Sequence, residues 1–263
     1  MQILNESVHS GDAGGIVPET FRIVRQILDR IDDPKTGRVV DTFQVKIPEK
    51  RMKQIGEAAK LLGASVYSHF PFVSGATPMA DVSDPVKAAT ECMINRTWMA
   101  NMSIVGAEGL PKLKDAGNVL RSETSVRASL RMPPTLDPVK AKEDLQKIIL
   151  SNPPYGAKVE VISISAGPGL HCPEMTPELE KAVMDSSKAF YGHEPISYGE
   201  GGSIPFLSSL SQQFPKAQFL VTGVLGPESN AHGANEMLEM AYTKKLICCL
   251  SYIISEFSKQ KAL

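Results

Sequence analysis

Residues 223–237 read GVLGPESNAHGANEM, and this stretch organises the interpretation of the whole chain. His232 lies between small residues, after an apolar run at Phe219-Leu220-Val221 that predicts a buried strand. A neutral imidazole on a loop between a strand and a helix is a common way to present a metal ligand. The alternative, for one histidine alone, is a surface residue in a turn.

A second stretch, residues 199–205, reads GEGGSIP. Its adjacent glycines allow main-chain N–H groups to approach an anion closely, which a side chain would prevent. The alternative is a flexible surface loop. The two stretches together favour a functional site over two unrelated loops.

The composition is that of an ordinary globular protein with room for two domains in 263 residues. A net charge of −1 provides no field to attract nucleic acid or an anionic membrane. We expect no membrane span and no targeting segment, because residues 1–10 have neither a basic nor an apolar region. The four cysteines have no CxxC or disulfide-framework spacing, so we expect a cytoplasmic protein.

The first part of the chain alternates predicted strands and helices. The expected strands are residues 2–8, 98–106, 119–130 and 159–165, and the expected helices are residues 19–33, 49–62, 84–93 and 137–150. In the first helix, the spacing places Phe21, Val24, Leu28 and Ile31 on one face. The order resembles a split βαβ unit, an α+β sandwich with helices over one face of the sheet.

The composition changes at Gly167-Pro168-Gly169, where we place a domain boundary. Beyond it, Thr176 is the predicted N-cap of a helix that reaches residue 191. A short helix, a strand over 217–222 and a long helix over 236–258 follow. One strand among three helices leaves its backbone groups unpaired, which predicts that part of this domain's sheet lies elsewhere.

GEGGSIP and the stretch around His232 are together similar to the C-terminal signature of the M20 family of zinc metallopeptidases, especially the carnosine and cytosolic non-specific dipeptidases. In that family a lid domain, which also forms the dimer interface, interrupts the catalytic domain. The resemblance covers essentially the whole chain. It implies an α/β protein: a split-βαβ, ferredoxin-like lid over residues 1–168, then the C-terminal portion of an α/β zinc-peptidase catalytic domain over residues 169–263. It also implies a homodimer through the lid.

Three residues of the first part match functional positions of the family. His9, in HSG, matches the lid histidine that reaches the partner subunit's active site and stabilises the oxyanion; the alternative is a turn histidine. Arg131, in SLRMPP, matches the arginine that binds the substrate's carboxylate; the alternative is a surface arginine at a strand end. Asn118 corresponds approximately to a polar substrate contact.

The second part contains the remaining matches. Ser203 and the backbone of Gly201 and Gly202 match the loop that holds the substrate's carboxylate, and the resemblance places Glu200 near the substrate's amino end. His232 matches the last metal ligand of the family.

The family's other metal ligands and its general base have no match in this sequence. It contains no Glu-Glu pair, and none of its five histidines is in an HxD motif. The resemblance implies two zinc or manganese ions, a bridging water and a glutamate base. A catalytic zinc site uses about three protein ligands, and one is recognisable here. We therefore expect a truncated chain that does not hydrolyse peptides alone.

Two hypotheses of different classes remain. The first is a metallopeptidase of the M20 dipeptidase type, acting on dipeptides or related amides with a free carboxylate. The second is a non-catalytic dimerisation or regulatory module that pairs with a full-length relative and supplies His9 in trans. A third, a zinc-independent amino-acid-binding module, would use Arg131 and the Gly-Gly-Ser loop.

Overall fold

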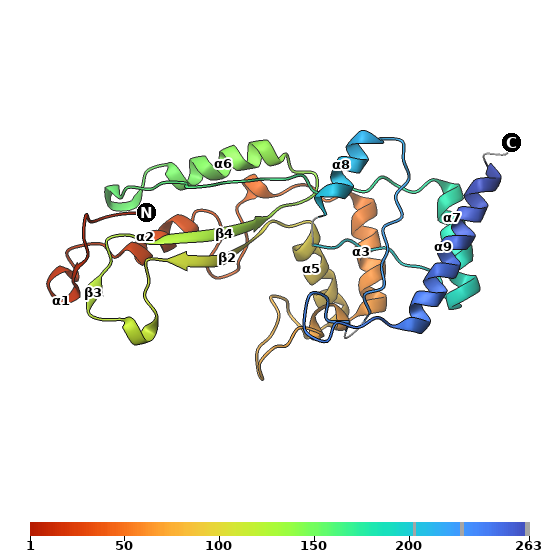
Figure 1. Cartoon of the computed structure of the whole chain (residues 1–263), viewed down its shortest axis with the longest axis horizontal. Helices are drawn as coiled ribbons and strands as arrows, with labels where there is room; N and C mark the ends of the chain where they lie inside the picture. Colours follow the sequence, from red (N-terminus) through yellow and green to blue (C-terminus); the bar gives the residue numbers. More distant parts are fainter. Residues whose placement is uncertain (202–203, 227–228, 261–263) are drawn as a thin grey trace. The chain divides into compact units, whose positions relative to one another are not determined.

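The computed structural model describes residues 1–201, 204–226 and 229–260. The chain separates into two compact units (Figure 1). Unit 1 comprises Met1–Pro48, Met93–Leu170 and Glu200–Ser208, and unit 2 comprises Glu49–Cys92, His171–Gly199 and Ser209–Leu263. The division into a lid and a C-terminal segment at residue 168 stays a prediction, because the two units interleave along the chain.

Two antiparallel strand pairs form the sheet structure of unit 1. Strand β2 (Asn101–Glu108) pairs with β4 (Ser125–Arg131), with Asn101 opposite Arg131 and Glu108 opposite Ser125. Strand β1 (Val8–His9) pairs with β3 (Val119–Leu120). The single strand expected over 119–130 is therefore two strands, and most of the strand expected over 2–8 is absent from the described structure.

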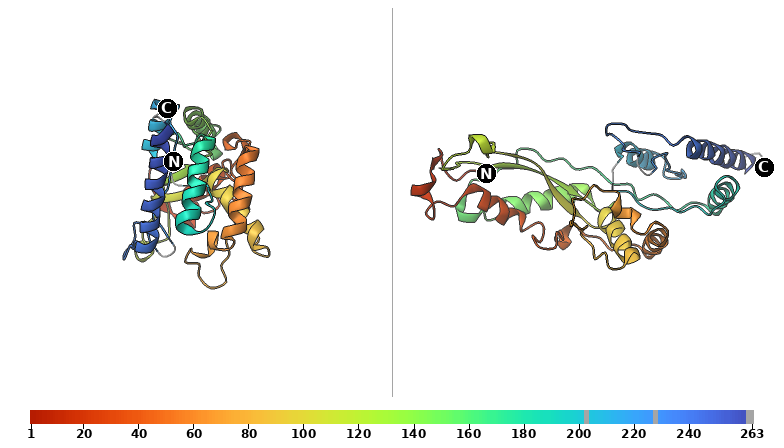
Figure 2. Two further views of the ribbon diagram at one scale, coloured as in Figure 1. Left: turned by 90° about the vertical axis from the view of Figure 1, so that its right-hand side faces the viewer. Right: turned by 90° about the horizontal axis from the view of Figure 1, so that it is seen from below.

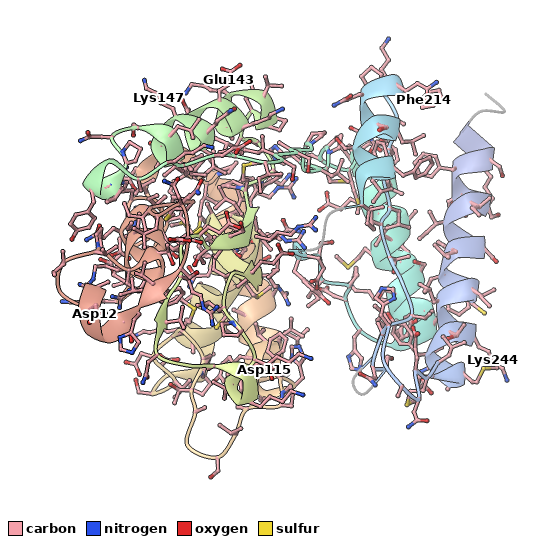
Figure 3. The ribbon with its side chains drawn as sticks, turned by 60° about the vertical axis from the view of Figure 1, so that its left-hand side comes forward. Asp12, Asp115, Glu143, Lys147, Phe214 and Lys244 are labelled. Atoms are coloured by element: carbon pink, nitrogen blue, oxygen red, sulfur yellow. The ribbon has the colours of Figure 1, made fainter. Side chains whose placement is uncertain are left out.

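Helices cover one face of the β2–β4 pair. The core there contains Phe43 and Ala141, and Met102 of β2 and Leu130 of β4 pack against it. Helix α6 (Pro138–Leu150) begins as predicted, because the Asp137 carboxylate accepts hydrogen bonds from the two following free N–H groups of the first turn. Its charged residues Glu143 and Lys147 point outward (Figure 3). An α/β fold with helices on one sheet face is thus confirmed.

The buried face of helix α2 (Thr20–Leu28) agrees in part with the predicted one. Val24 is buried and Leu28 packs against the core as expected, whereas the Phe21 side chain is 42% exposed. The helix ends at Leu28, five residues before the predicted end at 33, so the buried Ile31 lies beyond it. Ile23 and Ile27, which the predicted stripe does not include, are also buried, so the apolar face is broader than expected.

Residues 159–170 run back along unit 1 as extended chain (Figures 1 and 2). The strand expected over 159–165 is not formed in this described segment; Lys158 alone makes a bridge, to Gln2. Alternating side chains are compatible with a strand, but a strand also requires a neighbour for its backbone groups.

Unit 2 is mainly helical. Helix α3 (Glu49–Leu62) has the predicted bounds, and α7 (Pro177–Tyr191) begins after Thr176, whose hydroxyl accepts a hydrogen bond from the N–H of Leu179. Helices α7 and α9 (Met240–Gln260) lie side by side (Figure 2), with Leu179 and Ile253 in their shared core. The other helical elements of the chain are α1 (Ser10–Ala13), α4 (Ser65–Ser68), α5 (Pro85–Thr97), α8 (Pro205–Gln213), η1 (Asp41–Phe43), η2 (Leu113–Asp115) and η3 (Pro154–Gly156).

The strand expected over 217–222 is also not formed. Phe219 is buried and Val221 is exposed, but these described residues belong to no ladder. The long C-terminal helix begins at Met240, four residues after its expected start. None of the described helices combines the length and the apolar character that crossing a membrane requires.

Candidate functional site

His9 lies at the end of β1 and caps helix α1. Its Nδ1 atom accepts a hydrogen bond from the N–H of Gly11 at 3.1 Å, and the ring is otherwise exposed. A nitrogen that accepts a hydrogen bond carries no proton, so the neutral imidazole has its proton on Nε2. His9 therefore presents a single N–H donor to solvent. A Cβ atom at position 11 would lie 2.8 Å from Cε1 of His9, so a larger residue there would displace the imidazole ring.

Asn118 lies beside His9 although the sequence separates them widely. His9 is opposite Val119 in the β1–β3 pair, and the N–H of Ser10 donates to the carbonyl oxygen of Asn118 at 2.9 Å. The side chain of Asn118 is exposed. The structure thus brings two of the predicted site residues together, and we call His9 and Asn118 the lid pair.

Arg131 is at the opposite end of the strands. It is the last residue of β4 and pairs with Asn101, the first residue of β2. Helix α1 and strand β3, which adjoin the lid pair, lie beyond the other end of β4 (Figure 1). The residue is exposed, as expected for a guanidinium that binds a ligand or for a surface arginine.

Glu200 and Gly201 pack against Arg96, in the last turn of α5. Nη2 of Arg96 is 3.5 Å from Oε1 of Glu200, and a Cβ atom on Gly201 would lie 2.8 Å from the carbonyl oxygen of Arg96. Arg96 comes five residues before Asn101, and Asn101 is opposite Arg131 in the β2–β4 pair. The loop with Glu200 and Gly201 therefore lies at the same end of unit 1 as Arg131. Arg131, Glu200 and Gly201 are thus predicted site residues at one end of unit 1. Gly202 and Ser203 lie outside the described residues.

Arg96 is absent from the sequence-based site. Nothing in its surroundings, INRTW, distinguishes it from the basic residue that commonly ends a helix. Its contact with the GEGGSIP loop depends on two segments more than a hundred residues apart, which sequence spacing does not reveal.

His232 lies in an exposed turn of unit 2. Its backbone is left-handed, with φ of 61°, as are Asn230 and Asn235 on either side. The Nδ2 atom of Asn230 donates to the carbonyl oxygen of Ala234 at 2.6 Å, which closes the turn. Asn230 therefore structures the loop, and His232 lies in a small, tightly turned segment.

The described residues do not supply a complete metal site. No three His, Cys, Asp or Glu side chains of this part of the chain converge in a way that would hold an ion. His232 has suitable ligand chemistry, but one imidazole does not make a catalytic zinc site. No catalytic step through a metal is therefore assigned to these residues.

Two curated proteins are similar to nearly the whole chain. A cysteinylglycine-S-conjugate dipeptidase from Corynebacterium striatum is 27% identical over 241 residues, covering 90% of this chain and 49% of that protein. The Cys-Gly metallodipeptidase DUG1 from Saccharomyces cerevisiae is 23% identical over 239 residues, covering 89% of this chain and 47% of that protein. The chain thus spans about half the length of these relatives. No family model matches the sequence.

Three solved structures share the fold. The M20 family metallo-carboxypeptidase Sso-CP2 from Sulfolobus solfataricus matches with a TM-score of 0.69 and 19% identity, over 96% of this chain and 56% of that one. The yeast dipeptidase Dug1p (19% identity) and human carnosine dipeptidase 1 (15%) each match with a TM-score of 0.64, over 98% of this chain and 53% of theirs. The predicted resemblance to M20 dipeptidases is confirmed: the relatives are dipeptidases and the fold is that of M20 peptidases.

Proposed function

We propose that this chain takes part in the metal-dependent hydrolysis of dipeptides that end in a free carboxylate. The names of the two curated relatives support this substrate class, since both describe dipeptidases and one a metallodipeptidase. Cys-Gly is the substrate that the name of the yeast relative prints, so it is the first compound to test.

Four of the predicted site residues have a chemical role in this proposal. The guanidinium of Arg131 binds the substrate's carboxylate in a two-point pair. The carboxylate of Glu200 receives the substrate's ammonium group. The Nε2–H of His9 donates to the oxyanion that develops as the amide carbonyl is attacked, where a donor gives its largest benefit. Zinc or manganese remains the expected metal, with His232 as one ligand.

The observation that supports the proposal most is the separation of the lid pair from Arg131. Strand β4 is seven residues long, and that corresponds to roughly 20 Å. Two extended residues span only about 7 Å. The lid pair lies beyond the far end of β4, and side chains stand roughly perpendicular to a strand, so they shorten this gap little. One dipeptide therefore does not reach both His9 and Arg131 of the same chain, and we propose that His9 acts on substrate held by a second copy. Such an arrangement requires a symmetric homodimer through the lid.

Hydrolysis of Cys-Gly by the purified chain, with zinc or manganese added, tests the activity. Arg131→Met is expected to weaken binding of Cys-Gly by roughly ten- to a hundredfold, the loss of one charge-assisted pair. The Arg127→Met variant, with its substitution at an exposed position of the same strand, is the control. Equal affinity for Cys-Gly and its C-terminal amide would contradict the assignment of Arg131.

His9→Asn separates catalysis from stability. Asparagine is a good N-cap, so helix α1 keeps an acceptor for Gly11 while the imidazole N–H is lost. We expect an unchanged unfolding free energy and an unchanged affinity for Cys-Gly. In any preparation that contains a complete metal site and hydrolyses Cys-Gly, we expect a hydrolysis rate lower by about a hundredfold or more. The metal content of the same protein distinguishes the two hypotheses. A protein that binds Cys-Gly but contains no metal would favour a regulatory module that pairs with a full-length relative.

A further inference from the structure

The side chain of Arg96 is held in an unusual way at the end of α5. Its Nε atom is buried, yet it has no hydrogen-bond partner among the described residues. Its Nη2 atom is 3.5 Å from Oε1 of Glu200, at the outer limit of a hydrogen bond. A buried donor without a partner is costly, so a guanidinium in this position calls for an explanation.

The main chain of Gly201 fixes the loop against the same residue. A Cβ atom on Gly201 would lie 2.8 Å from the carbonyl oxygen and 2.8 Å from the Cγ atom of Arg96. The loop therefore touches the backbone and the stem of Arg96, while the neighbouring Glu200 side chain faces its head. The carbonyl oxygen and the stem of Arg96 thus contact Gly201, and its guanidinium contacts Glu200.

The geometry of a guanidinium explains the open Nε atom. Nε–H and the adjacent Nη–H lie on one edge, which matches the two oxygens of a carboxylate. Glu200 now meets this edge with one oxygen, and 59% of its side-chain surface is exposed. A small movement of the Glu200 side chain would give Nε its partner and still leave lone pairs of the carboxylate facing solvent.

We infer that Arg96 is the positioning residue of the loop formed by Glu200 and Gly201, and that it orients the Glu200 carboxylate toward the ammonium group of a dipeptide. This inference rests on the proposed function. Arg96 touches no substrate; it acts through Glu200, so it determines selectivity for a free amino end and has no part in bond cleavage.

The positioning is tested first without any ligand. Backbone ¹⁵N relaxation of Gly201, which reports its order parameter, and the NMR signal of the Arg96 Nε–H are measured in the full chain. Arg96→Ala and Arg96→Lys are both expected to lower the order parameter of Gly201 from about 0.85 to below about 0.6, because alanine lacks the side chain and lysine lacks the planar edge. Glu200→Gln should shift the Nε–H signal. Arg22→Ala, at an exposed position of α2, is the matched control. An unchanged order parameter of Gly201 in Arg96→Ala would overturn the positioning.

The selectivity is tested with two peptides, Cys-Gly and N-acetyl-Cys-Gly. In wild-type protein the free amine should bind roughly tenfold or more tightly, and Arg96→Ala should remove that preference while leaving the affinity for the acetylated peptide unchanged. An equal loss for both peptides would mean that Arg96 has a merely structural role. Wild-type protein that binds neither peptide would overturn the proposed function and the role in amine recognition, whereas the relaxation experiment reports on the positioning alone.

Discussion

Gly201 has no room for a side chain, since a Cβ atom there would press on the backbone of Arg96 as well as on its stem. Backbone cannot move as a flexible side chain can. We expect Gly201→Ala to destabilise the fold by about 1–3 kcal/mol, the usual cost of overpacking. Gly167→Ala, whose Cβ atom would meet nothing within 4 Å, is the control. Equal unfolding free energies of the two variants in urea would contradict this contact.

The sequence identifies Gly201 as special, but for a different reason. Adjacent glycines predict a backbone that approaches an anion, which stays a prediction; the structure shows a second requirement, the packing of this glycine against a helix end. His9 is a similar case. Its residue type predicts an imidazole donor, while the use of Nδ1 as a helix cap, which leaves Nε2 as that donor, depends on local geometry that a motif does not specify.

Asp137 controls the start of α6 at the scale of an element. Its Oδ1 atom accepts hydrogen bonds from the N–H groups of Val139 and Lys140, at 2.8 and 3.3 Å. We expect Asp137→Ala to lower the unfolding free energy by about 1 kcal/mol and Asp137→Asn to preserve it, because asparagine is an equivalent N-cap. Urea unfolding of the three proteins measures the difference. A loss in Asp137→Asn as large as in Asp137→Ala would point to charge and not to capping.

Helices α7 and α9 are joined by Tyr191, whose hydroxyl donates to the carbonyl oxygen of Tyr242 at 3.0 Å. Burial, and then the nearby Tyr242, raises the pKa of Tyr191 to about 12 from an ordinary value of 10.0. Between these values the unfolded chain loses the tyrosine proton and the folded chain keeps it, so stability falls as the pH rises from 10 toward 12. Tyr191→Phe should lose less stability over that range. The tyrosinate absorbance of the wild-type protein minus that of Tyr191→Phe gives the titration midpoint of Tyr191. A midpoint near the ordinary value of 10.0 would contradict the raised pKa.

Helices are more predictable than strands in this chain, and the reason is local. Asp137 and Thr176 mark helix starts within a few residues, and the N-cap hydrogen bond that each makes is local. Residues 159–165 and 217–222 have the alternation or apolar character of strands, but a ladder needs a second segment whose position no local pattern gives.

Contacts between distant segments set the organisation of the whole molecule. In unit 2, Lys50 and Arg51, in the first turn of α3, hold residues 171–174: Lys50 pairs with Glu174 at 2.8 Å, and Arg51 donates to the carbonyl oxygen of Cys172 at 2.7 Å. These contacts fasten the chain just before α7. No motif in the sequence predicts them.

The hydrogen bond and charge of Lys50 lower the pKa of Glu174 below its ordinary value of 4.5. The folded state therefore favours the carboxylate, so this contribution to stability is present above pH 4.5 and is lost as the pH falls through the lowered pKa. We expect amide exchange of residues 171–174, corrected for its intrinsic pH dependence, to increase under those acidic conditions. In Glu174→Gln the increase should disappear; if it persists, another group causes the loosening.

The pairing of His9 with Asn118 is also beyond sequence analysis. The resemblance relates each residue separately to a family position, only approximately for Asn118, and the β1–β3 pair shows that they are neighbours. Their separation from Arg131 likewise follows from the register of β2 and β4 and not from any spacing along the chain. The sequence therefore nominates the candidate residues one by one, and their grouping in space requires the structure.

The length of β4 has a genetic consequence. If each site takes Arg131 from one copy and His9 from the other, two inactive alleles, one altered at each residue, compensate for each other when expressed together. The mixed dimer then contains one intact site and one doubly defective site. Alleles altered at His9 and Asn118, which lie on the same side of the interface, would not restore activity in any combination.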